Sequence, residues 1–343
     1  MAQVAIRLLG REGLLDTGLN VRREGDRVLI PISAEPSQEQ ATSLNALIRD
    51  YQVLSMDFVG KSRPARTIDE VLKEKLPAHL AHLVPHSIDI IGNVAVLELA
   101  PELHPHRRVV AEAVMQVHRN VKTVLAKSSP VGGELRLREF EVLAGSGMTE
   151  TLHRENDCLY YLDVSRVFFS PRLSHERARV AAQVGEGEVV VDMFAGVGPF
   201  SILIAHRLGD VRVHAIDVNP DAINYLERNI EANHVRSKVS AYLGDAQQVV
   251  QGRLIGVADR VIMNLPERAL EYVGSACRAL KPTGGTIHFY EFSRGHNMFS
   301  KAQERLRDQV LRHGRRVEGF SKCRRVKSTA PHEWQIALDA RVR

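Results

Sequence analysis

Cysteine is scarce in this sequence, and long apolar runs are absent. The three cysteines among 343 residues, Cys158, Cys277 and Cys323, are far apart, so they form neither a metal-spaced pair nor a disulfide framework. We expect reduced thiols, as in a cytoplasmic protein. No apolar run has the length of a membrane span, and no signal-peptide pattern is found. These absences exclude a disulfide-stapled secreted scaffold and an integral membrane protein.

The composition is that of an ordinary globular protein. Hydrophobic residues make up 44% and charged residues 25% of the chain, which is typical of a chain with a buried core. A length of 343 residues allows two or three domains. The formal net charge is +5, with 15 histidines not counted, and this excess of positive charge favours a polyanionic partner.

The stretch Val189–Ile202, VVVDMFAGVGPFSI, is the most informative part of the sequence. Three valines lead into Asp192, and a glycine turn and an apolar run follow, which is typical of the first strand, turn and helix of a doubly wound sheet. Gly196 and Gly198 allow a sharp bend and the close approach of a ligand. Because a carboxylate would repel a phosphate, we expect a cationic or zwitterionic ligand such as S-adenosylmethionine. A purely structural turn is the alternative.

Polar residues also end the next three predicted strands. Asp217 follows the glycine turn by about twenty residues, where a carboxylate can bind both ribose hydroxyls of a nucleoside. Asp245 ends the third strand and suits an adenine amino group. The fourth strand, Ala258–Pro266, ends in Asn-Leu-Pro, which resembles the Asn-Pro-Pro-aromatic signature of enzymes that methylate planar nitrogens. This set indicates S-adenosylmethionine rather than a nicotinamide cofactor.

The sequence predicts three domains. Their ranges are 1–64 for a small N-terminal α+β unit, 65–164 for an α+β middle domain, and 165–343 for an α/β domain. In the first, Ser37–Tyr51 is expected to be a helix and Val53–Phe58 a strand. The basic stretch Lys61–Arg66 contains proline and serine and predicts a linker, whose charges are either solvated or in contact with RNA phosphates.

Further elements are expected in the second and third domains. Hairpins are predicted at Ser87–Leu99 and Leu152–Asp163, strands at Val121–Ala126 and Arg136–Leu143, and helices at Arg107–His118 and Met298–Arg312. Ser321–Pro331 reads as a charged strand or turn, and Trp334–Leu338 is expected to close the sheet. The densest positive run comprises Lys322, Arg324, Arg325 and Lys327. It predicts either a solvated edge strand or a phosphate-binding surface.

Several motifs, in order, resemble those of the archaeal and eukaryotic type of tRNA (guanine-N1)-methyltransferase, which acts on guanosine 37 next to the anticodon. The motifs are IDIIGNVAVLELAPEL, GELRLREFEVLAG, RVFFSPRLSHERARVA, VDMFAGVGPFSI, VIMNLPERALEY and KSTAPHEW. The resemblance covers nearly the whole chain. It implies a Rossmann-like class I methyltransferase domain, an α+β middle domain, and an N-terminal domain that binds the tRNA outer corner in archaeal members. We expect a monomer that binds tRNA and S-adenosylmethionine.

The chemistry of this family requires particular groups. Guanine N1 is a poor nucleophile while protonated, so a base must accept its proton and a cation or donor must meet the charge on O6. No metal is needed. By the resemblance, Glu176 matches the base, Arg136 the O6 partner, and Asn264 the amide that holds the guanine. The structural alternatives are a helix ion pair for Glu176 and a solvated strand position for Arg136.

The donor pocket is expected at the strand ends. Its predicted members are Arg172, Asp192, Phe194, Ala195, Gly196, Val197, Gly198, Asp217, Val218, Asp245, Ala246, Asn264 and Pro266. Phe168 stands where some relatives carry tyrosine, so a hydroxyl contact is lost there. The closing Ala-Pro-His also departs from a commoner Ala-Pro-Gly form, which leaves the role of that loop open.

Two other functions remain open. One is the related wyosine-pathway transferase, which transfers the aminocarboxypropyl group of the same cofactor to a tricyclic base at the same tRNA position. The set of Arg136, Glu176 and Asn-Leu-Pro favours methyl transfer, because it provides for deprotonation of N1. The other is a non-catalytic tRNA-binding relative, against which the intact acids at three strand ends argue.

Overall fold

The chain folds into two compact units, Met1–Arg66 and Thr67–Arg343. The structure is a computed structural model, and it describes residues 2–48, 50–60, 67–129, 132–133, 135–330 and 332–343. The linker predicted at Lys61–Arg66 lies outside these described residues.

The first unit has a small core between two helices. Helix α1 (Ala2–Arg11) and helix α2 (Gln38–Leu47) flank a short hairpin of β1 (Arg22–Glu24) and β2 (Arg27–Leu29). Helix α2 begins where predicted, because Ser37 and Gln40 form a reciprocal capping box. The buried core residues are Leu8, Leu9, Leu14 and Leu44. The strand predicted at Val53–Phe58 is wrong: this segment is not part of any strand, since no neighbouring strand pairs with it.

The second unit begins with a four-stranded sheet in the order β3-β4-β5-β6. Its strands are β3 (Asp89–Ile91), β4 (Val94–Leu97), β5 (Thr123–Lys127) and β6 (Phe140–Gly145), and its helices are α3 (Ile68–Leu72) and α4 (Arg107–Val117). The α4 side chains Val110 and Val114 are buried, and α4 lies against β5 and β6. The strand predicted from Arg136 starts only at Phe140, because Arg136 has a left-handed backbone (φ 54°) that a strand cannot include.

A hairpin joins this sheet to the α/β domain. It consists of β7 (Glu150–Glu155) and β8 (Cys158–Asp163), as predicted. Helix α7 (Pro220–Ala232) holds it through two asparagines one turn apart. Asn229 accepts from the Tyr161 amide at 2.7 Å and donates to its carbonyl at 3.1 Å, and Asn233, just after the helix, does the same at Leu159. The outer edge of β8 is therefore paired by side chains instead of by another strand.

A seven-stranded sheet forms the centre of the α/β domain. Its order is β11-β10-β9-β12-β13-β15-β14, with β9 (Val189–Asp192), β10 (Arg212–Asp217), β11 (Val239–Leu243), β12 (Arg260–Met263), β13 (Gly285–Arg294), β14 (Val317–Ala330) and β15 (Glu333–Val342). The first five are parallel, and β15 pairs antiparallel with β13 and β14. This topology confirms the predicted class I methyltransferase fold.

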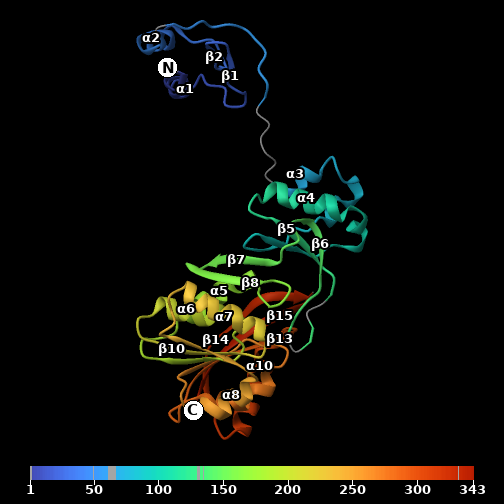
Figure 1. The fold of residues 1–343 in the computed structure, drawn as a ribbon, viewed down its shortest axis with the longest axis vertical. Helices are drawn as coiled ribbons and strands as arrows, with labels where there is room; N and C mark the ends of the chain where they lie inside the picture. The colour runs from blue at the N-terminus through green and yellow to red at the C-terminus, as the bar shows by residue number, and fades with distance from the viewer. Residues whose placement is uncertain (1, 49, 61–66, 130–131, 134, 331) are drawn as a thin grey trace. The chain divides into compact units, whose positions relative to one another are not determined.

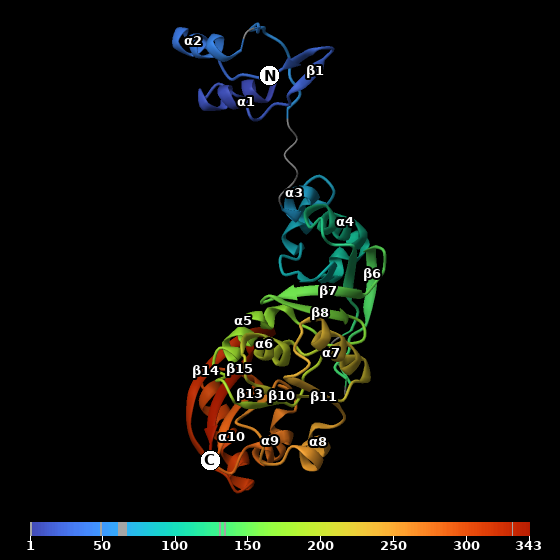
Figure 2. The same ribbon diagram turned by 60° about the vertical axis from the view of Figure 1, so that its left-hand side comes forward.

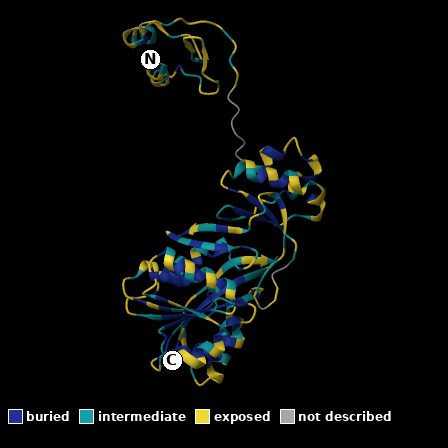
Figure 3. Cartoon of the chain, in the orientation of Figure 1, coloured by how far each residue is buried: buried dark blue, intermediate teal, exposed yellow. Residues whose placement is uncertain are grey.

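Helices cover both faces of this sheet, as Figures 1 and 2 show. Helices α5 (Ser174–Ala181), α6 (Pro199–Arg207) and α7 lie on one face, and α8 (Ala246–Arg253), α9 (Val273–Ala279) and α10 (Met298–Arg312) lie on the other. Alternate residues of β9 supply the two cores, since Val190 packs with the first set and Val191 with the second. Figure 3 shows the buried positions along the central strands. The central strands are therefore buried on both faces.

The C-terminal hairpin differs from the prediction in one respect. The charged segment is a strand, β14, but it forms the sheet edge, whereas β15 with Trp334–Leu338 is inserted between β13 and β14. The expectation that Trp334–Leu338 closes the sheet is therefore wrong. The buried pattern of β15 explains this: Ile336, Ala337 and Leu338 are all inaccessible, which an edge strand does not require. No helix within the described ranges has both the length and the apolar character needed to cross a bilayer.

Candidate functional site

A cleft opens at the carboxyl ends of β9, β10, β11 and β12. Because these strands are parallel, the loops after them meet at one edge of the sheet. They contribute Phe194–Gly196, Asp217–Asn219, Gly244–Ala246 and Asn264–Leu265 to its wall. The remaining lining residues include Gly133, Leu135, Arg136, Phe168, Phe169, Leu173, Arg177, Glu267, Arg268 and Tyr272. The middle domain and the α/β domain, both within the second unit, thus share one cleft.

The glycine turn is shaped by backbone geometry and by packing. Gly196 has φ 55°, and its amide donates to Asp217 Oδ2 at 2.7 Å. Gly198 has φ 89° and caps α6, and a Cβ at that position would lie 2.4 Å from Leu226 Cδ1. Gly196 therefore shapes the wall of the cleft, whereas Gly198 allows α6 to pack against α7.

The Asp217 carboxylate faces the cleft from the end of β10. Its Oδ1 accepts from the Asn219 amide at 2.9 Å, and Oδ2 accepts from Gly196. Burial raises the pKa of Asp217, although these amides and nearby Arg136 act against the shift. Two backbone amides therefore fix an acid at the position where the hydroxyls of a ribose would be bound.

Asp192 lies beneath the glycine turn and is completely buried. Ser201 Oγ donates to its Oδ2 at 2.8 Å, whereas Oδ1 meets no hydrogen-bond donor among the described residues. Burial raises the pKa of Asp192 to about 7, opposed by Ser201 and by the nearby Phe194 amide. Asp192 is not part of the cleft lining, so its charge can act on a cationic ligand only through the glycine turn and not by contact.

An aromatic corner adjoins Asp245. Tyr272 donates its hydroxyl to Asp245 Oδ2 at 3.1 Å, and its ring meets that of Phe194 edge-on, with centroids 4.9 Å apart. The other Asp245 oxygen caps α8 by accepting from the Gln247 and Gln248 amides. Two rings and an acid in one corner suit a planar heterocycle with an exocyclic amino group.

Arg136 joins the cleft lining from the loop before β6. Its guanidinium carbon lies 4.5 Å from the centroid of the Phe168 ring, and its Nη2 donates to Glu267 Oε1 at 3.4 Å. Nε lies 3.3 Å from Glu267 Oε2 in the same ion pair, without forming a hydrogen bond within the described part of the chain. Burial lowers the pKa of Arg136, opposed by Glu267 and Asp217, but arginine remains a cation at neutral pH. Arg136 thus places a cation, paired with Glu267, in the lining of the cleft.

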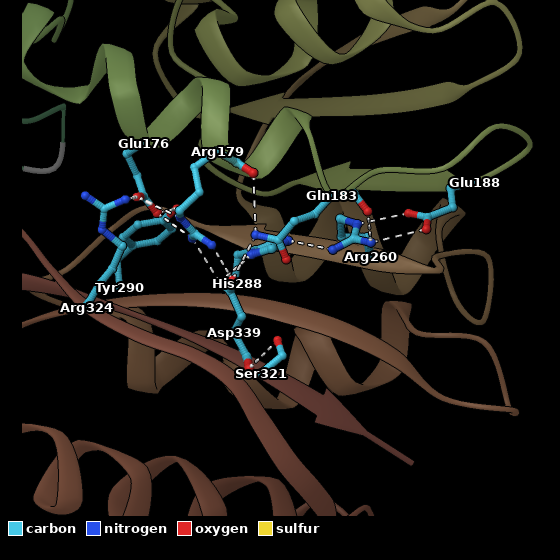
Figure 4. A network of polar contacts seen from close by, with 10 residues as sticks. All are labelled: Glu176, Arg179, Gln183, Glu188, Arg260, His288, Tyr290, Ser321, Arg324 and Asp339. Carbon is cyan, nitrogen blue, oxygen red and sulfur yellow. Dashed lines mark hydrogen bonds and ion pairs between the residues drawn. The ribbon is translucent and has the colours of Figure 1, made fainter.

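Glu176 lies in a buried network and does not line the cleft (Figure 4). Its Oε1 accepts from Tyr290 Oη at 2.8 Å and from Arg179 Nη2 at 2.6 Å. Its Oε2 accepts from Arg179 Nε at 3.0 Å and lies 3.6 Å from Arg324 Nη1. Its neighbours in sequence, Leu173 and Arg177, do line the cleft. The carboxylate therefore lies behind the cleft wall, and its pairing with Arg179 is the helix ion pair that the sequence offered as the structural alternative.

Other predicted residues also lie outside the cleft lining. Arg172 pairs with Asp89 of β3 through Nε and Oδ1 at 2.6 Å. Val197 is fully buried in the core beside α6. Pro266 lines a neighbouring cavity together with Glu291 and Arg305. The structure thus brings together Arg136, Phe194–Gly196, Asp217–Val218, Asp245–Ala246 and Asn264.

Sequence reasoning missed three residues that shape the cleft. Glu267 pairs with Arg136, Tyr272 pairs with Asp245, and Gln335 donates to Asn264. Glu267 directly follows Asn-Leu-Pro in the sequence, and this position could have indicated that it lies at the cleft. The other two pair with residues 27 and 71 positions away, and no local pattern indicates such contacts.

The cleft suits S-adenosylmethionine on chemical grounds. A buried acid with a free oxygen, a second acid at the end of β10 and an aromatic corner match a cation, a ribose and an adenine, respectively. The turn at Gly196 exposes backbone to the ligand. Among the described residues, no three His, Cys, Asp or Glu side chains are arranged to hold a metal ion.

Two family models match this chain. Residues 151–318 match the TRM5/TYW2 methyltransferase domain, and residues 68–149 match the TYW2 N-terminal domain. A tRNA (guanine(37)-N(1))-methyltransferase Trm5b of Pyrococcus abyssi is 39% identical over 340 residues, which is 99% of this chain and 96% of the relative. A tRNA(Phe) (4-demethylwyosine(37)-C(7)) aminocarboxypropyltransferase of Pyrococcus horikoshii is 36% identical over 80% of this chain and 96% of its own length.

Solved structures give the same picture. A complex of aTrm5 and tRNALeu matches with a TM-score of 0.73 at 31% identity, covering 99% of this chain and 96% of the other. A Pyrococcus horikoshii TYW2 in complex with MeSAdo matches with a TM-score of 0.67 at 35% identity, covering 80% and 97%. With these similarities over nearly its whole length, the chain belongs to the TRM5/TYW2 family of methyltransferases.

Proposed function

We propose that this protein is a tRNA (guanine(37)-N(1))-methyltransferase that uses S-adenosylmethionine. The observation that carries the proposal is the shared cleft. Arg136 and Asn264 suit a guanine base, whereas Asp217, Gly196 and the aromatic corner suit the cofactor. All of these residues line the same cleft. Near full-length similarity to Trm5b of Pyrococcus abyssi supports the same activity.

The cofactor residues divide by chemistry. When bound, S-adenosylmethionine supplies an electrophilic methyl group on a sulfonium. The carboxylate of Asp217 binds the ribose hydroxyls, and the corner of Phe194, Tyr272 and Asp245 receives the adenine. Asp192, with its unpaired oxygen, attracts the positive end of the ligand through the glycine turn. These residues bind and orient the donor and need not move a proton.

The guanine residues perform different tasks. Arg136 donates to O6 and stabilises the negative charge that develops there as N1 loses its proton. The Phe168 ring beneath its guanidinium limits the directions in which the cation can point. Asn264 holds the base next to the methyl donor. Guanine therefore meets one cation and one amide of the same cleft lining.

Glu176 is proposed as the acceptor of the N1 proton. In the structure its carboxylate is held by Arg179, Tyr290 and Arg324 behind the cleft wall. It lies one helical turn beyond Leu173 and next to Arg177, both of which line the cleft. We propose that the Glu176 side chain turns into the cleft when guanosine 37 enters.

The test is methylation of unmodified tRNA transcripts. A transcript with guanosine at position 37 should gain one methyl group on N1, and a matched transcript with adenosine there should gain none. Nucleoside digestion followed by mass spectrometry identifies the product and its position. Equal methylation of both transcripts, or a methyl group on another nucleoside, would contradict the proposal.

Aminocarboxypropyl transfer is the second candidate. It is favoured by the match of residues 68–149 to the TYW2 N-terminal domain and by the similarity to the Pyrococcus horikoshii transferase. The same assay separates the two activities, because that group adds far more mass than a methyl group. A third reaction on tRNA carrying 4-demethylwyosine tests this alternative on its own substrate.

The partner and domain assignments extend the proposal. We infer that the anticodon stem-loop is the RNA segment bound at the cleft, that the protein acts as a monomer, and that it works in the cytoplasm where tRNA is modified. The exposed β14 residues Lys322 and Arg325 supply a basic edge for phosphates. The division into 1–64, 65–164 and 165–343 assigns the first part to tRNA contact. The compact unit Met1–Arg66 is compatible with a separate binding domain.

A further inference from the structure

The Arg179 guanidinium forms hydrogen bonds with two carboxylates of the buried network. Arg179 of α5 donates through Nε and Nη2 to Glu176, and through Nη1 and Nη2 to Asp339 of β15. Both carboxylate side chains are 1% exposed. Figure 4 shows Arg179 between the two acids. Two buried anions thus share one partly buried cation, whose side chain is 15% exposed.

Asp339 accepts further hydrogen bonds besides those from Arg179. His288 Nδ1 lies 2.7 Å from Asp339 Oδ1, and Gln183 Nε2 donates to Oδ2 at 3.0 Å. Arg260 can only donate to His288 Nε2, so the imidazole proton is on Nδ1 and points at Asp339. Burial by itself would raise the pKa of Asp339, but the bonds from His288 and Arg179 outweigh it and hold the pKa well below its usual range. Asp339 therefore stays ionised and paired.

Glu176 has a second set of neighbours. Tyr290 of β13 donates to it, and Arg324 of β14 lies 3.6 Å away with its side chain 36% exposed. Its helix neighbour Arg177 is turned away and pairs with Glu155. The charged groups that face Glu176 are therefore Arg179 and Arg324, with Asp339 acting through Arg179.

We propose that Asp339 is a positioning residue that frees Glu176 to act as the proton acceptor, by keeping Arg179 paired when Glu176 leaves it. This inference rests on the proposed function, in which Glu176 accepts the N1 proton of guanosine. A carboxylate that is the sole partner of a buried arginine cannot leave without stranding a buried charge. With Asp339 in place, Arg179 keeps a partner and Glu176 can turn into the cleft.

The first test is Asp339→Asn, which keeps the shape and removes the charge. Arg179 then belongs to Glu176 alone, so Glu176 is a weaker proton acceptor and is held more tightly. The single-turnover rate of methyl transfer should fall about 10- to 100-fold, a part of the usual contribution of a positioned base. The acidic limb of its pH profile should move to lower pH. Affinity for S-adenosylmethionine, measured by calorimetry, should not change.

The second variant should move the acidic limb of the pH profile in the opposite direction. Tyr290→Phe removes a donor from Glu176 and leaves the ring in the core, so it should fold even where Asp339→Asn does not. Without that hydrogen bond the ionised carboxylate is less stabilised, and the acidic limb should move to higher pH. Damage to the fold alone cannot produce two shifts of opposite sign. An acidic limb that stays in place in Tyr290→Phe overturns the inference.

Two further variants complete the experiment. Glu188→Gln removes a carboxylate from the far end of the network, where it pairs with Arg260, and should leave rate and pH limb as in the wild type. If Asp339→Asn and Glu188→Gln lose rate equally with no shift of the limb, the network is only structural and the inference is wrong. Glu176→Gln separates the two proposals. If it keeps the wild-type rate, the proposed base itself is wrong; if it loses rate while Asp339→Asn does not, only this inference fails.

Discussion

Gln335 Nε2 donates to Asn264 Oδ1 at 2.9 Å, and this single contact fixes the orientation of the cleft amide. Because the Asn264 oxygen is occupied, its Nδ2 is the group left to donate into the cleft. Gln335 is 2% exposed and comes from β15, so the C-terminal hairpin orients a group at the end of β12. The orientation of this cleft amide therefore depends on β15, none of whose residues is in the cleft lining.

The first prediction follows from this contact. Gln335→Leu should leave the fold intact but allow the Asn264 amide to rotate, so the single-turnover methylation rate should fall about fivefold, in line with the loss of one hydrogen bond of about 1 kcal/mol. Affinity for S-adenosylmethionine should be unchanged in calorimetry. Gln303→Leu is the matched control, since this glutamine bonds Cys323 of β14. A similar rate loss in both variants would show a general effect of hairpin packing.

The second prediction concerns Asp217 and the ribose. Asp217→Asn retains a shape similar to the wild type but removes the charge and half of the acceptor capacity that the Gly196 and Asn219 amides use. Cofactor affinity should weaken by about 1–3 kcal/mol, the usual loss for charge-assisted hydrogen bonds. Isothermal calorimetry with S-adenosylhomocysteine measures it. Unchanged affinity would remove Asp217 from the cofactor pocket.

Much of the cofactor side of the cleft could be predicted from the sequence. Parallel strands place their carboxyl ends at one edge, so Asp217, Asp245 and Asn264 were expected together and are found together. The glycine turn was also recognisable, because its residues are contiguous in the sequence. Local sequence pattern therefore determined which residues line this half of the site.

The positions of Arg136 and Glu176 could not be predicted in the same way. Arg136 was expected in a strand but has a left-handed backbone in a loop. Packing on Phe168 and pairing with Glu267 determine this conformation. Glu176 binds Tyr290, which is 114 residues further along the chain. Such contacts arise from the order of the strands in the sheet, and a single sequence does not reveal that order.

The third prediction concerns Asp192 and pH. Burial raises its pKa from 3.8 to about 7, so its contribution to stability is fully present below about pH 4 and is lost as the pH rises through 7. Asp192→Asn cannot ionise and should therefore gain about 1–3 kcal/mol of unfolding free energy relative to the wild type at pH 8. Near pH 4 that gain should vanish. Urea unfolding at both pH values measures the difference.

Asp308→Asn is the control for this measurement, since Asp308 is an exposed acid on α10. Its stability difference from the wild type should be small and nearly independent of pH. A gain for Asp192→Asn of equal size at pH 4 and pH 8 would mean that folding does not raise the pKa of Asp192. Its unpaired oxygen would then need another explanation.

The fourth prediction concerns Arg136. Arg136→Ala should lower the single-turnover rate about 10²–10³-fold, because the charge on O6 is left without its donor. Arg138→Ala is the matched control: this arginine is two positions along the same loop, near Glu98 and Asp89, and does not line the cleft. It should keep a rate within about threefold of the wild type, as a change outside the catalytic contacts does. Equal losses in the two variants would indicate that the loop as a whole, and not the Arg136 guanidinium, is required.

The last prediction couples Arg136 to Glu176. If Glu176 removes the N1 proton while Arg136 stabilises the charge on O6, both act on one transition state, and their effects depend on each other. Glu176→Gln alone should cost about 10²–10⁴-fold in single-turnover rate. The double variant with Arg136→Ala should be much faster than the product of the two losses predicts, since without the base there is less charge on O6 to stabilise. Rates measured over pH 6–9 with saturating tRNA and cofactor give the coupling. Strict multiplication of the two losses would mean that the two residues act in separate steps, and Glu176 would then serve the fold or RNA binding instead of proton transfer.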